Sequence, residues 1–380
     1  MAKPKRIVIA PNAFKGSVDA ITAAAALARG LNSSSLPVET ICRPVGDGGD
    51  GTADVLIAQL GLRRLRAQVH DALGRPRDCE FGLADAQRMA ILNFADAAGL
   101  RWLSTADAHP LFATSFGVGE LILHALDAGA RRIVLGLGGS ATVDGGAGIL
   151  RALGVRFLDA NGLELPDRPD VLDRVATVDM GGLDPRLDEG AITLLCDVDN
   201  LLLGPHGAAA MFGPQKGATH EDVKRLEAGL RVLADVLRRQ TGRDVGALVG
   251  GGAAGGVGAG LHALLGAKLV SGIEYVLDAI GFEKVLDGAA LVITGEGAVD
   301  DQTLHGKAPY GVAMRARQRG LPVIAVAGQI PLQPSAALRQ AFTVLLAIGH
   351  GPMALAEAMR MTEQDLERCG QTIGMLLALA

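Results

Sequence analysis

Short apolar runs alternate with stretches of helical spacing at both ends of the chain. At the start, Arg6–Ala10 and Val38–Val45 are apolar runs bounded by turn residues, which predicts two buried strands. The first should lead into a helix that Ser17 could cap, and the second into a helix over Thr52–Leu60. Near the end, three further apolar runs predict strands over Ala290–Thr294, Val323–Ala327 and Phe342–Ile348.

Helix signals accompany the last three strands. Pro309 suits a first helical position after the loop Gly295–Gly306, and this helix should end by Gly320. Thr362 and Asp365 have the spacing of a capping box, which predicts that the last helix begins there.

The middle of the chain has a different pattern. Three short runs separated by turn residues predict an antiparallel meander over Leu65–His70, Cys79–Leu83 and Met89–Phe94. A mixed segment follows, with a helix, two strands and a hairpin turn predicted at Gly117–Asp127, Arg132–Leu135, Ile192–Cys196 and Ala160–Gly162. The two strands at the start and the three at the end would form one five-stranded parallel sheet, with a second domain inserted between them.

Length supports this division. A chain of 380 residues is too long for one ordinary hydrophobic core. We therefore expect an α/β protein with a discontinuous parallel-sheet domain over residues 1–63 and 288–380, and an inserted mixed α/β domain over residues 64–287.

Composition narrows the class of protein. Hydrophobic residues make up 49% of the chain and aromatic residues only 3%, which suits aliphatic helices packed on a buried sheet. The net charge of −5 and the lack of a basic patch argue against a nucleic-acid partner. No apolar run reaches about 18 residues, so we expect no membrane span. The four cysteines are far apart and show no metal-binding spacing, which favours reduced thiols in the cytoplasm.

Candidate chemistry lies just after the predicted strands, because ligands of open parallel sheets bind at the carboxyl ends of the strands. In the first domain these loops are Pro11–Ser17, Gly46–Thr52 and Gly295–Thr303. Each combines glycine with charged side chains, namely Lys15, Asp47, Asp50, Glu296 and Asp300.

The inserted region contributes three more glycine-rich or acidic segments. Leu137–Gly146 follows a strand and opens a helix, which is typical of an anion-binding loop. Asp197 and Asp199 come directly after a strand, and such a carboxylate pair suits Mg²⁺. Gly250–Gly260 is the most glycine-dense stretch of the chain.

These features favour phosphoryl transfer, which needs amides, cations, a metal and a positioned hydroxyl. Neither a Gly-x4-Gly-Lys-Ser/Thr loop nor a protein-kinase catalytic set is present. The alternatives remain open at this level: a glycine cluster can be a plain loop, and Lys216 can be a solvated turn lysine. A nicotinamide-dependent dehydrogenase could use the 250–260 glycines and Glu274, although Leu248-Val249 is a poor strand. A non-catalytic binding protein would leave the many carboxylates at strand ends unexplained.

Taken together, the motifs resemble those of the bacterial class I glycerate kinase family, of the glycerate 2-kinase type. The resemblance extends over nearly the whole chain, through Ala10–Ser17, Pro44–Thr52, Thr114–Glu120, Gly138–Gly148, Cys196–Asn200, Phe212–Ala218, Gly252–Leu261 and Ile293–Thr303. It implies ATP, Mg²⁺ and D-glycerate as reactants, with 2-phosphoglycerate rather than the 3-phosphate as the usual product. It also implies a flavodoxin-like domain interrupted by a second α/β domain, with the active site in the cleft between them, in a monomer or a homodimer.

The resemblance also suggests roles for individual residues. Lys15 and Ser17 would bind an anion, and Asp50 and Thr303 would contact the substrate. Asp197 is the leading catalytic candidate and would hold Mg²⁺ with Asp199, while the general-base candidates are Glu296, Asp300 and Asp47. The nucleotide phosphates would bind at Gly138, Gly139, Ser140, Lys216, Gly255 and Gly256. The chain departs from the family pattern at Asn12, Asp50, Val143 and Ala298, and Asn12 cannot act as a base.

Overall fold

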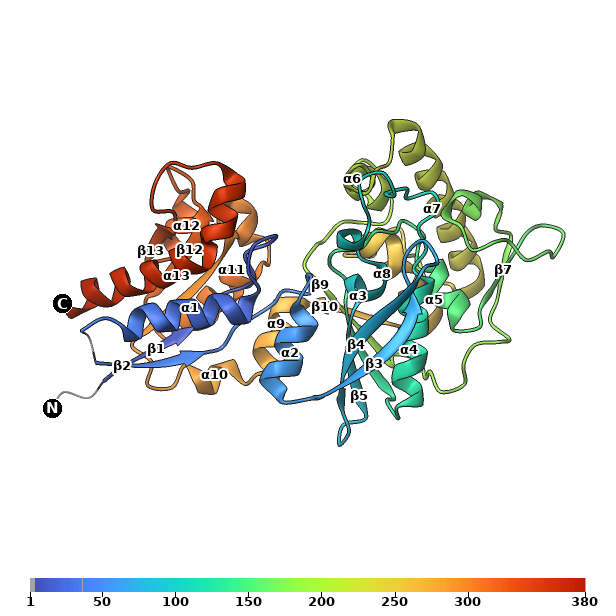
Figure 1. The fold of residues 1–380 in the computed structure, drawn as a ribbon. Coiled ribbons are helices and arrows are strands. Elements are labelled where there is room, and N and C mark those ends of the chain that lie inside the picture. The colour runs from blue at the N-terminus through green and yellow to red at the C-terminus, as the bar shows by residue number, and fades with distance from the viewer. Residues whose placement is uncertain (1–3, 36, 380) are drawn as a thin grey trace. The chain divides into compact units, whose positions relative to one another are not determined.

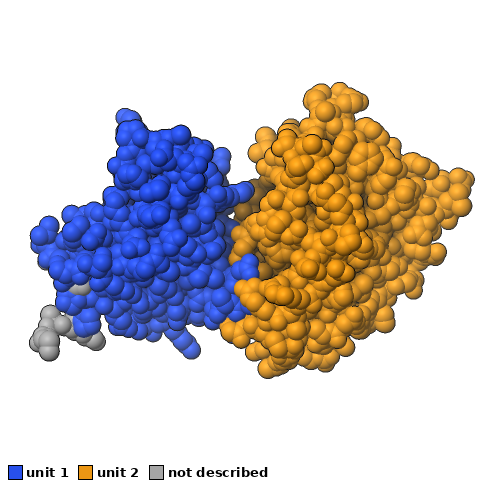
Figure 2. Space-filling view, viewed as in Figure 1, with its two compact units in different colours: residues 1–47, 54–60, 273–380 blue, residues 48–53, 61–272 orange. Residues whose placement is uncertain are grey.

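The computed structural model describes residues 4–35 and 37–379. The chain divides into two compact units, which Figure 2 shows in different colours. Unit 1 consists of residues 1–47, 54–60 and 273–380, and unit 2 of residues 48–53 and 61–272. Residues 273–287, which the sequence assigned to the inserted domain, therefore belong to unit 1. Residues 48–53 and 61–63, which the sequence assigned to the parallel-sheet domain, belong to unit 2.

Unit 1 is built on a five-stranded sheet, as the sequence predicted (Figure 1). The strands are β1 (Lys5–Ile9), β2 (Val38–Cys42), β11 (Leu291–Ala298), β12 (Val323–Gln329) and β13 (Val344–Ala347). All neighbours are parallel, in the order β13-β12-β11-β1-β2. Counted along the chain within this unit, that order is 2-1-3-4-5, the flavodoxin-like arrangement. The predicted fold class is therefore confirmed.

Helices flank this sheet. They are α1 (Ala20–Asn32), α2 (Thr52–Leu60), α9 (Gly272–Ala279), α10 (Phe282–Val285), α11 (Ala308–Gln318), α12 (Ala336–Ala341) and α13 (Leu355–Ala378), with a short 3-10 turn η4 (Asp301–Leu304). The helices α1 and α13 pack so closely that a Cβ atom on Gly30 would lie 1.9 Å from the carbonyl oxygen of Glu367. Glycine is required there because the two backbones approach each other directly.

Several local predictions in unit 1 were wrong. Asp19 rather than Ser17 caps α1, since its side chain accepts a hydrogen bond from the Thr22 amide at 2.7 Å. Thr362 and Asp365 do not begin a helix but are buried in the middle of α13. In addition, β11 continues to Ala298, through the first part of the expected loop, while β2 and β13 are shorter than expected.

Unit 2 contains a six-stranded mixed sheet in the order β10-β9-β6-β5-β4-β3. Its strands are β3 (Arg63–His70), β4 (Pro76–Ala84), β5 (Met89–Asn93), β6 (Arg132–Gly136), β9 (Ile192–Cys196) and β10 (Lys268–Ser271). The first three form the predicted antiparallel meander, and the other neighbours are parallel. The strand β10 was not predicted from the sequence pattern. A separate pair, β7 (Arg156–Leu158) and β8 (Thr177–Asp179), lies beside the predicted turn at residues 160–162.

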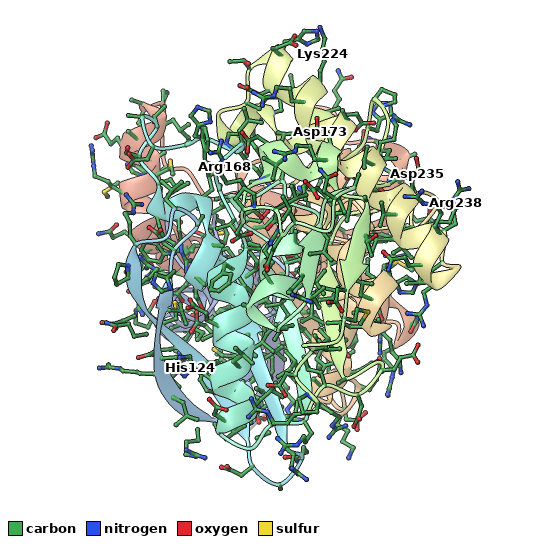
Figure 3. All side chains as sticks on the ribbon, turned by 90° about the vertical axis from the view of Figure 1, so that its right-hand side faces the viewer. His124, Arg168, Asp173, Lys224, Asp235 and Arg238 are labelled. Carbon is green, nitrogen blue, oxygen red and sulfur yellow. The ribbon has the colours of Figure 1, made fainter. Side chains whose placement is uncertain are left out.

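The helices of unit 2 are α3 (Phe94–Ala98), α4 (Phe116–Asp127), α5 (Ala147–Ala152), α6 (Ala208–Phe212), α7 (His220–Thr241) and α8 (Ala253–Leu265), with 3-10 turns η1 (Leu100–Trp102), η2 (Pro169–Arg174) and η3 (Pro214–Lys216). The longest of them, α7, is amphipathic. Its leucines are buried, whereas Lys224, Asp235 and Arg238 project from its outer face (Figure 3). No helix among residues 4–35 and 37–379 is long and apolar enough to cross a bilayer.

Candidate functional site

In unit 1, the loops after β1 and β2 meet through an amide and a carboxylate. The backbone N–H of Asn12 donates to the carbonyl of Gly295 at 2.8 Å, which ties the first loop to β11. The side-chain amide of Asn12 donates to Asp47 Oδ2 at 2.9 Å, and Asp47 is only 7% exposed. Asn12 therefore acts as a hydrogen-bond donor to Asp47 in this chain.

A second buried carboxylate, Glu296, lies near the carboxyl end of β11. Its side chain accepts a hydrogen bond from the Thr303 hydroxyl at 2.9 Å and is 8% exposed. Burial raises the pKa of Glu296 to about 7, although the nearby Lys307 ammonium lowers it. A carboxyl group that titrates near neutrality can accept a proton and release it again, which is what general base catalysis requires.

The other two predicted residues of this loop have structural partners. Asp300 is exposed and caps η4, because its side chain accepts a hydrogen bond from the Gln302 amide at 2.8 Å. Thr303 is fully buried and uses its hydroxyl on Glu296. The structure thus places Thr303 beside Glu296, as its hydrogen-bond donor.

Lys15 lies at the tip of a tight turn after β1. The turn is closed by hydrogen bonds between the backbones of Phe14 and Val18 at 2.9 and 3.1 Å. The Lys15 side chain is exposed and makes no hydrogen bond or ion pair to any described residue. Ser17, by contrast, has its hydroxyl 2.6 Å from the Thr362 hydroxyl on α13. The turn therefore presents a free ammonium group and is fastened by Ser17.

In unit 2, the segment around Gly48 crosses the carboxyl ends of β6 and β9. The Gly138 amide donates to the Gly48 carbonyl at 2.9 Å. A Cβ atom on Gly138 would lie 2.3 Å from Gly49 Cα. The Gly138 amide is therefore already used within the protein, and its glycine is explained by backbone packing.

Beside this crossing lies a polar cluster, of which only Asp50 was predicted from the sequence. Arg101 forms ion pairs with Asp50 and Asp96 and lies over the indole ring of Trp102, 4.6 Å from its centre. Asn93 donates to Asp50 Oδ1 at 3.2 Å. Neither Asn93 nor Arg101 belongs to a recognisable motif, so only their places at the end of β5 and in the segment after it could have pointed to them.

Lys216 is buried, and the interpretation as a solvated turn lysine was wrong. Its ammonium group donates to Ser140 Oγ at 2.9 Å and to the Thr142 carbonyl at 2.7 Å. Burial lowers the pKa of Lys216 to about 7, and Asp144 partly offsets this effect. Lys216 thus fixes the loop after β6 through two hydrogen bonds of its buried ammonium group.

Asp144, in the same loop, anchors two helix starts. Its Oδ2 accepts hydrogen bonds from the Ser115 amide at 2.8 Å, the Ser115 hydroxyl at 2.6 Å and the Gly148 amide at 3.1 Å. Its Oδ1 accepts another from Gly146 at 3.1 Å. Because Ser115 caps α4 and Gly146 caps α5, this carboxylate fixes both helices relative to the loop.

The glycine-dense stretch forms part of a helix. Gly255 and Gly256 have φ angles of +70° and +95° within α8, and a Cβ atom on Gly255 would lie 2.0 Å from the Thr142 carbonyl. These glycines pack against the loop that Lys216 holds. No strand in the described part of the chain comes directly before them, although β10 does precede Glu274. A dinucleotide-binding turn requires that first strand, so the dehydrogenase reading loses its main support.

The two predicted metal ligands follow β9. Asp197 is half-buried and Asp199 exposed. Across residues 4–35 and 37–379, no group of three or more His, Cys, Asp or Glu side chains could share a metal ion. Mg²⁺ commonly takes one or two carboxylates and completes its shell with water and phosphate oxygens. The pair thus fits Mg²⁺ in the company of a bound phosphate.

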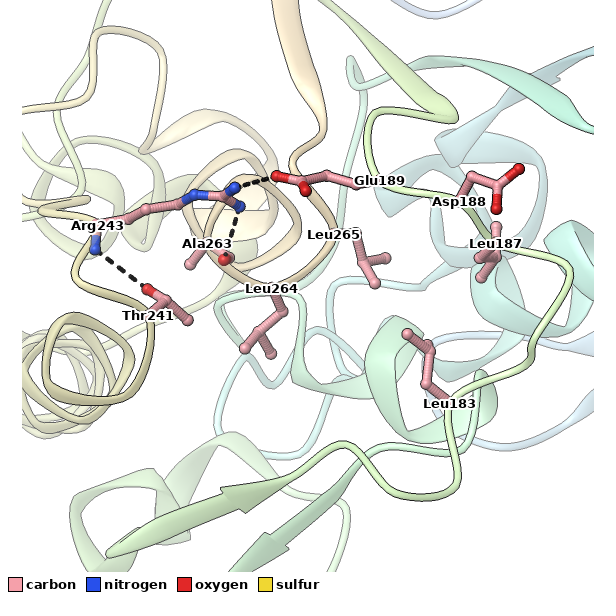
Figure 4. A pocket seen from close by; sticks show the side chains of 9 residues that line it. All are labelled: Leu183, Leu187, Asp188, Glu189, Thr241, Arg243, Ala263, Leu264 and Leu265. Carbon is pink, nitrogen blue, oxygen red and sulfur yellow. Dashed lines mark hydrogen bonds and ion pairs between the residues drawn. The ribbon is translucent and has the colours of Figure 1, made fainter.

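A cavity of about 330 Å³ in unit 2 contains none of the predicted site residues (Figure 4). It lies where α7 and α8 end, beside the segment before β9. Arg243 donates to the Ala263 carbonyl at 3.0 Å and pairs with Glu189 there. These contacts hold the end of α8 in place.

Comparison with known proteins agrees with the resemblance. Residues 7–378 match the sequence profile of the glycerate kinase family. The chain belongs to that family. An Escherichia coli K12 protein named glycerate 2-kinase is 40% identical over 378 residues, which cover 98% of each chain. A Bacillus subtilis protein named glycerate kinase is 41% identical over 375 residues, covering 99% of this chain and 98% of its own.

The solved structures agree as well. A crystal structure from Salmonella typhimurium LT2, described as a candidate glycerate kinase 2, superposes with a TM-score of 0.84. It is 40% identical to this chain and the match covers 99% of both. The predicted membership of a glycerate kinase family, and with it the class of kinase, is confirmed.

Proposed function

We propose that this protein transfers the terminal phosphoryl group of ATP to the 2-hydroxyl of D-glycerate, which gives 2-phosphoglycerate and ADP. The names of its relatives support glycerate as the acceptor, and one of them specifies the 2-position. The single structural observation that supports the chemistry is Glu296, a buried carboxyl group at a strand end with a pKa of about 7. Such a group suits the removal of a proton from a hydroxyl nucleophile.

In this proposal Glu296 accepts the hydroxyl proton at its carboxylate. Thr303 orients Glu296 by donating to Oε1, and this replaces the direct substrate contact first expected of Thr303. Asp47 and Asp300 are weaker candidates for the base. Asp47 already accepts a hydrogen bond from Asn12, and Asp300 caps a 3-10 turn. The free ammonium group of Lys15 binds an anionic part of one reactant, while Ser17 holds its turn.

The loop after β6 binds the nucleotide phosphates in unit 2. Gly139 and Ser140 contact the phosphates, and Lys216 positions the loop through its hydrogen bonds to Ser140 and Thr142. Gly255 and Gly256 support the same loop through close packing. Asp197 and Asp199 would hold Mg²⁺, which would neutralise charge on the phosphates. The four free thiols favour a reducing compartment, so we place the protein in the cytoplasm.

The test is a direct assay of the product. The purified protein is incubated with ATP, Mg²⁺ and D-glycerate, and phosphorus NMR identifies the phosphorylated carbon from its coupling pattern. We expect a phosphate on carbon 2. Folded protein without turnover would contradict the proposed function, and a phosphate on carbon 3 would contradict the proposed position. Titration with nicotinamide nucleotides in a parallel sample should give no binding.

A further inference from the structure

Asn93, the last residue of β5, contains a buried acceptor without a donor. The side chain is fully buried, and its Oδ1 atom has no hydrogen-bond partner in the described structure. Buried side-chain oxygens almost always find a donor, so this oxygen is able to accept a hydrogen bond from a bound molecule.

The direction of this oxygen is fixed by its neighbours. The Asn93 amide nitrogen donates to Asp50 Oδ1 at 3.2 Å and lies 3.4 Å from Asp96 Oδ1. Turning the amide around would place Oδ1 against two carboxylates, which repel it. The Oδ1 atom therefore faces the other way, toward Gly136.

A second oxygen acceptor, the Gly48 carbonyl, lies near Asn93 Oδ1 beside Gly136. A Cβ atom on Gly136 would lie 3.3 Å from the Gly48 carbonyl oxygen and 3.5 Å from Asn93 Oδ1. Asp50 adds a carboxylate that is one-third exposed. A phosphate group would bring more oxygen acceptors to these oxygens and would be repelled. A hydroxyl group would supply the donor that Asn93 lacks.

A cation lies close to these acceptors. Arg101 donates to the same Asp50 oxygen as Asn93 does, and its guanidinium carbon lies 4.6 Å from the centre of the Trp102 ring. The side chain is 39% exposed. Its ion pairs occupy two of the five guanidinium N–H groups. The remaining ones can bind a carboxylate in the paired geometry that arginine favours.

We propose that this cluster in unit 2 is the subsite for the three-carbon hydroxy acid. Arg101 binds the carboxylate of D-glycerate, and Asn93 Oδ1 accepts a hydrogen bond from one of its hydroxyls. Asp50 lies between them and holds both side chains in place. This assignment rests on the proposed function and names two substrate ligands beyond it, Asn93 and Arg101.

Trp102 makes the subsite directly observable. It is the only tryptophan of the chain, and Arg77 and Arg101 lie over its ring. Titration of the complete protein with D-glycerate, without ATP, should change its fluorescence in a saturable way. Asn93→Ala should weaken this binding about fivefold to tenfold, since one hydrogen bond to the ligand is lost. Asn161→Ala, in an exposed turn of the same unit, is the matched control and should bind as the wild type does.

Two analogues separate ligand contact from a structural role. D-lactate lacks the 3-hydroxyl and 3-hydroxypropionate lacks the 2-hydroxyl. If Asn93 accepts a hydrogen bond from one hydroxyl of D-glycerate, Asn93→Ala should lower the affinity for D-glycerate. It should leave unchanged the affinity for the analogue that lacks this hydroxyl. Equal weakening of all three ligands overturns the proposal, as does unchanged binding of D-glycerate. Dependence of wild-type binding on K⁺ that disappears in Asn93→Ala also overturns it, because Oδ1 would then hold an ion.

Kinetic constants test Arg101 and separate this inference from the proposed function. Arg101→Lys keeps the charge but loses the paired geometry, so it should raise KM for D-glycerate at least tenfold and leave KM for ATP unchanged. A wild-type enzyme that turns over D-glycerate while both variants keep its KM would overturn the subsite alone. A wild-type protein that neither binds nor phosphorylates D-glycerate would overturn the proposed function itself.

Discussion

Replacing Glu296 by Gln should stabilise the protein at pH 8 and abolish most of its activity. Glutamine has nearly the same shape and can still accept the hydrogen bond that Thr303 donates. It cannot ionise, however, so it avoids the unfavourable burial of a carboxylate. The same change removes the proposed base.

The size of the effect follows from the pKa. Burial raises the pKa of Glu296 from its ordinary value of 4.5 to about 7. Between these two pH values the unfolded chain has lost the proton while the folded protein still holds it. Stability is therefore highest below pH 4.5 with respect to this group, and it falls as the pH rises to 7. The total loss is about 3 kcal/mol, since each pH unit of the difference corresponds to about 1.4 kcal/mol.

Urea unfolding followed by circular dichroism at pH 5 and pH 8 measures this effect. We expect Glu296→Gln to exceed the unfolding free energy of the wild type by only about 1 kcal/mol at pH 5 and by about 3 kcal/mol at pH 8. Glu357→Gln, an exposed residue of the same unit, should change little at either pH. Equal stability of Glu296→Gln and wild type at pH 8 would refute the raised pKa. A variant that keeps its kcat would refute the assignment of the base.

Three further tests use substitutions in unit 2. Asp197→Asn should lower kcat by several orders of magnitude, and Asp199→Asn should lower it less. If steady-state kinetics show a loss below about tenfold for Asp197→Asn, Asp197 does not stabilise the transition state. Gly255→Ala should destabilise by at least about 3 kcal/mol in urea unfolding, because its Cβ would meet a carbonyl oxygen at 2.0 Å. Gly242→Ala, with a similar φ of +73° but open space around it, should lose only about 1 kcal/mol, and equal losses would contradict the packing argument. Asp144→Asn should lower the unfolding free energy by about 2 kcal/mol in the same assay, because the new side-chain NH2 group then faces backbone N–H donors. An unchanged unfolding midpoint would show that the hydrogen bonds of Asp144 do not stabilise the protein.

The sheet of unit 1 could be predicted from sequence because its strands are buried on both faces. Such strands are nearly continuous apolar runs, and this signal survives without any tertiary information. The strand β10 gave a weaker signal, since it is short and none of its residues is fully buried. The helix α8 was hidden by its own glycines, which propensity assigns to loops.

Cap positions were harder to predict, because several residue types compete for them. Both Ser17 and Asp19 are good cap residues at the start of α1. The hydroxyl of Ser17 finds its partner on α13, more than three hundred residues away in sequence, and leaves the cap to Asp19. Thr362 has the spacing of a cap but lies where α13 packs against this turn. In both cases a distant contact decides between equivalent local choices.

The acidic and basic residues of the candidate site were found from their positions after strands, but their tasks were not. Lys216 was visible as a lysine between glycines, yet only the structure shows that its ammonium is buried under Ser140. Asn93 and Arg101 were missed because no motif contains them. An unpartnered oxygen is a property of the packed protein, so no pattern of residue types can reveal it.

The glycines of this chain serve two different needs, and the distinction bears on where ligands bind. Some, such as Gly138 and Gly255, stand where another backbone comes within about 2 Å of the missing Cβ. At those positions another stretch of backbone occupies the place that a side chain would take. Others, such as Gly51 and Gly306, have φ angles of +87° and +91° with no atom within 4 Å of the missing Cβ. A left-handed glycine beside open space, in a loop at the carboxyl end of a parallel strand, leaves its backbone accessible to a ligand. The loops after β2 and β11 keep this accessibility, and Asp47 lies in the first of them while Glu296 lies near the end of β11, just before the second. Much of the glycine content that first suggested phosphate binding is therefore explained by close packing of the backbone. The accessible glycines mark the parts of the loops that remain available to reactants.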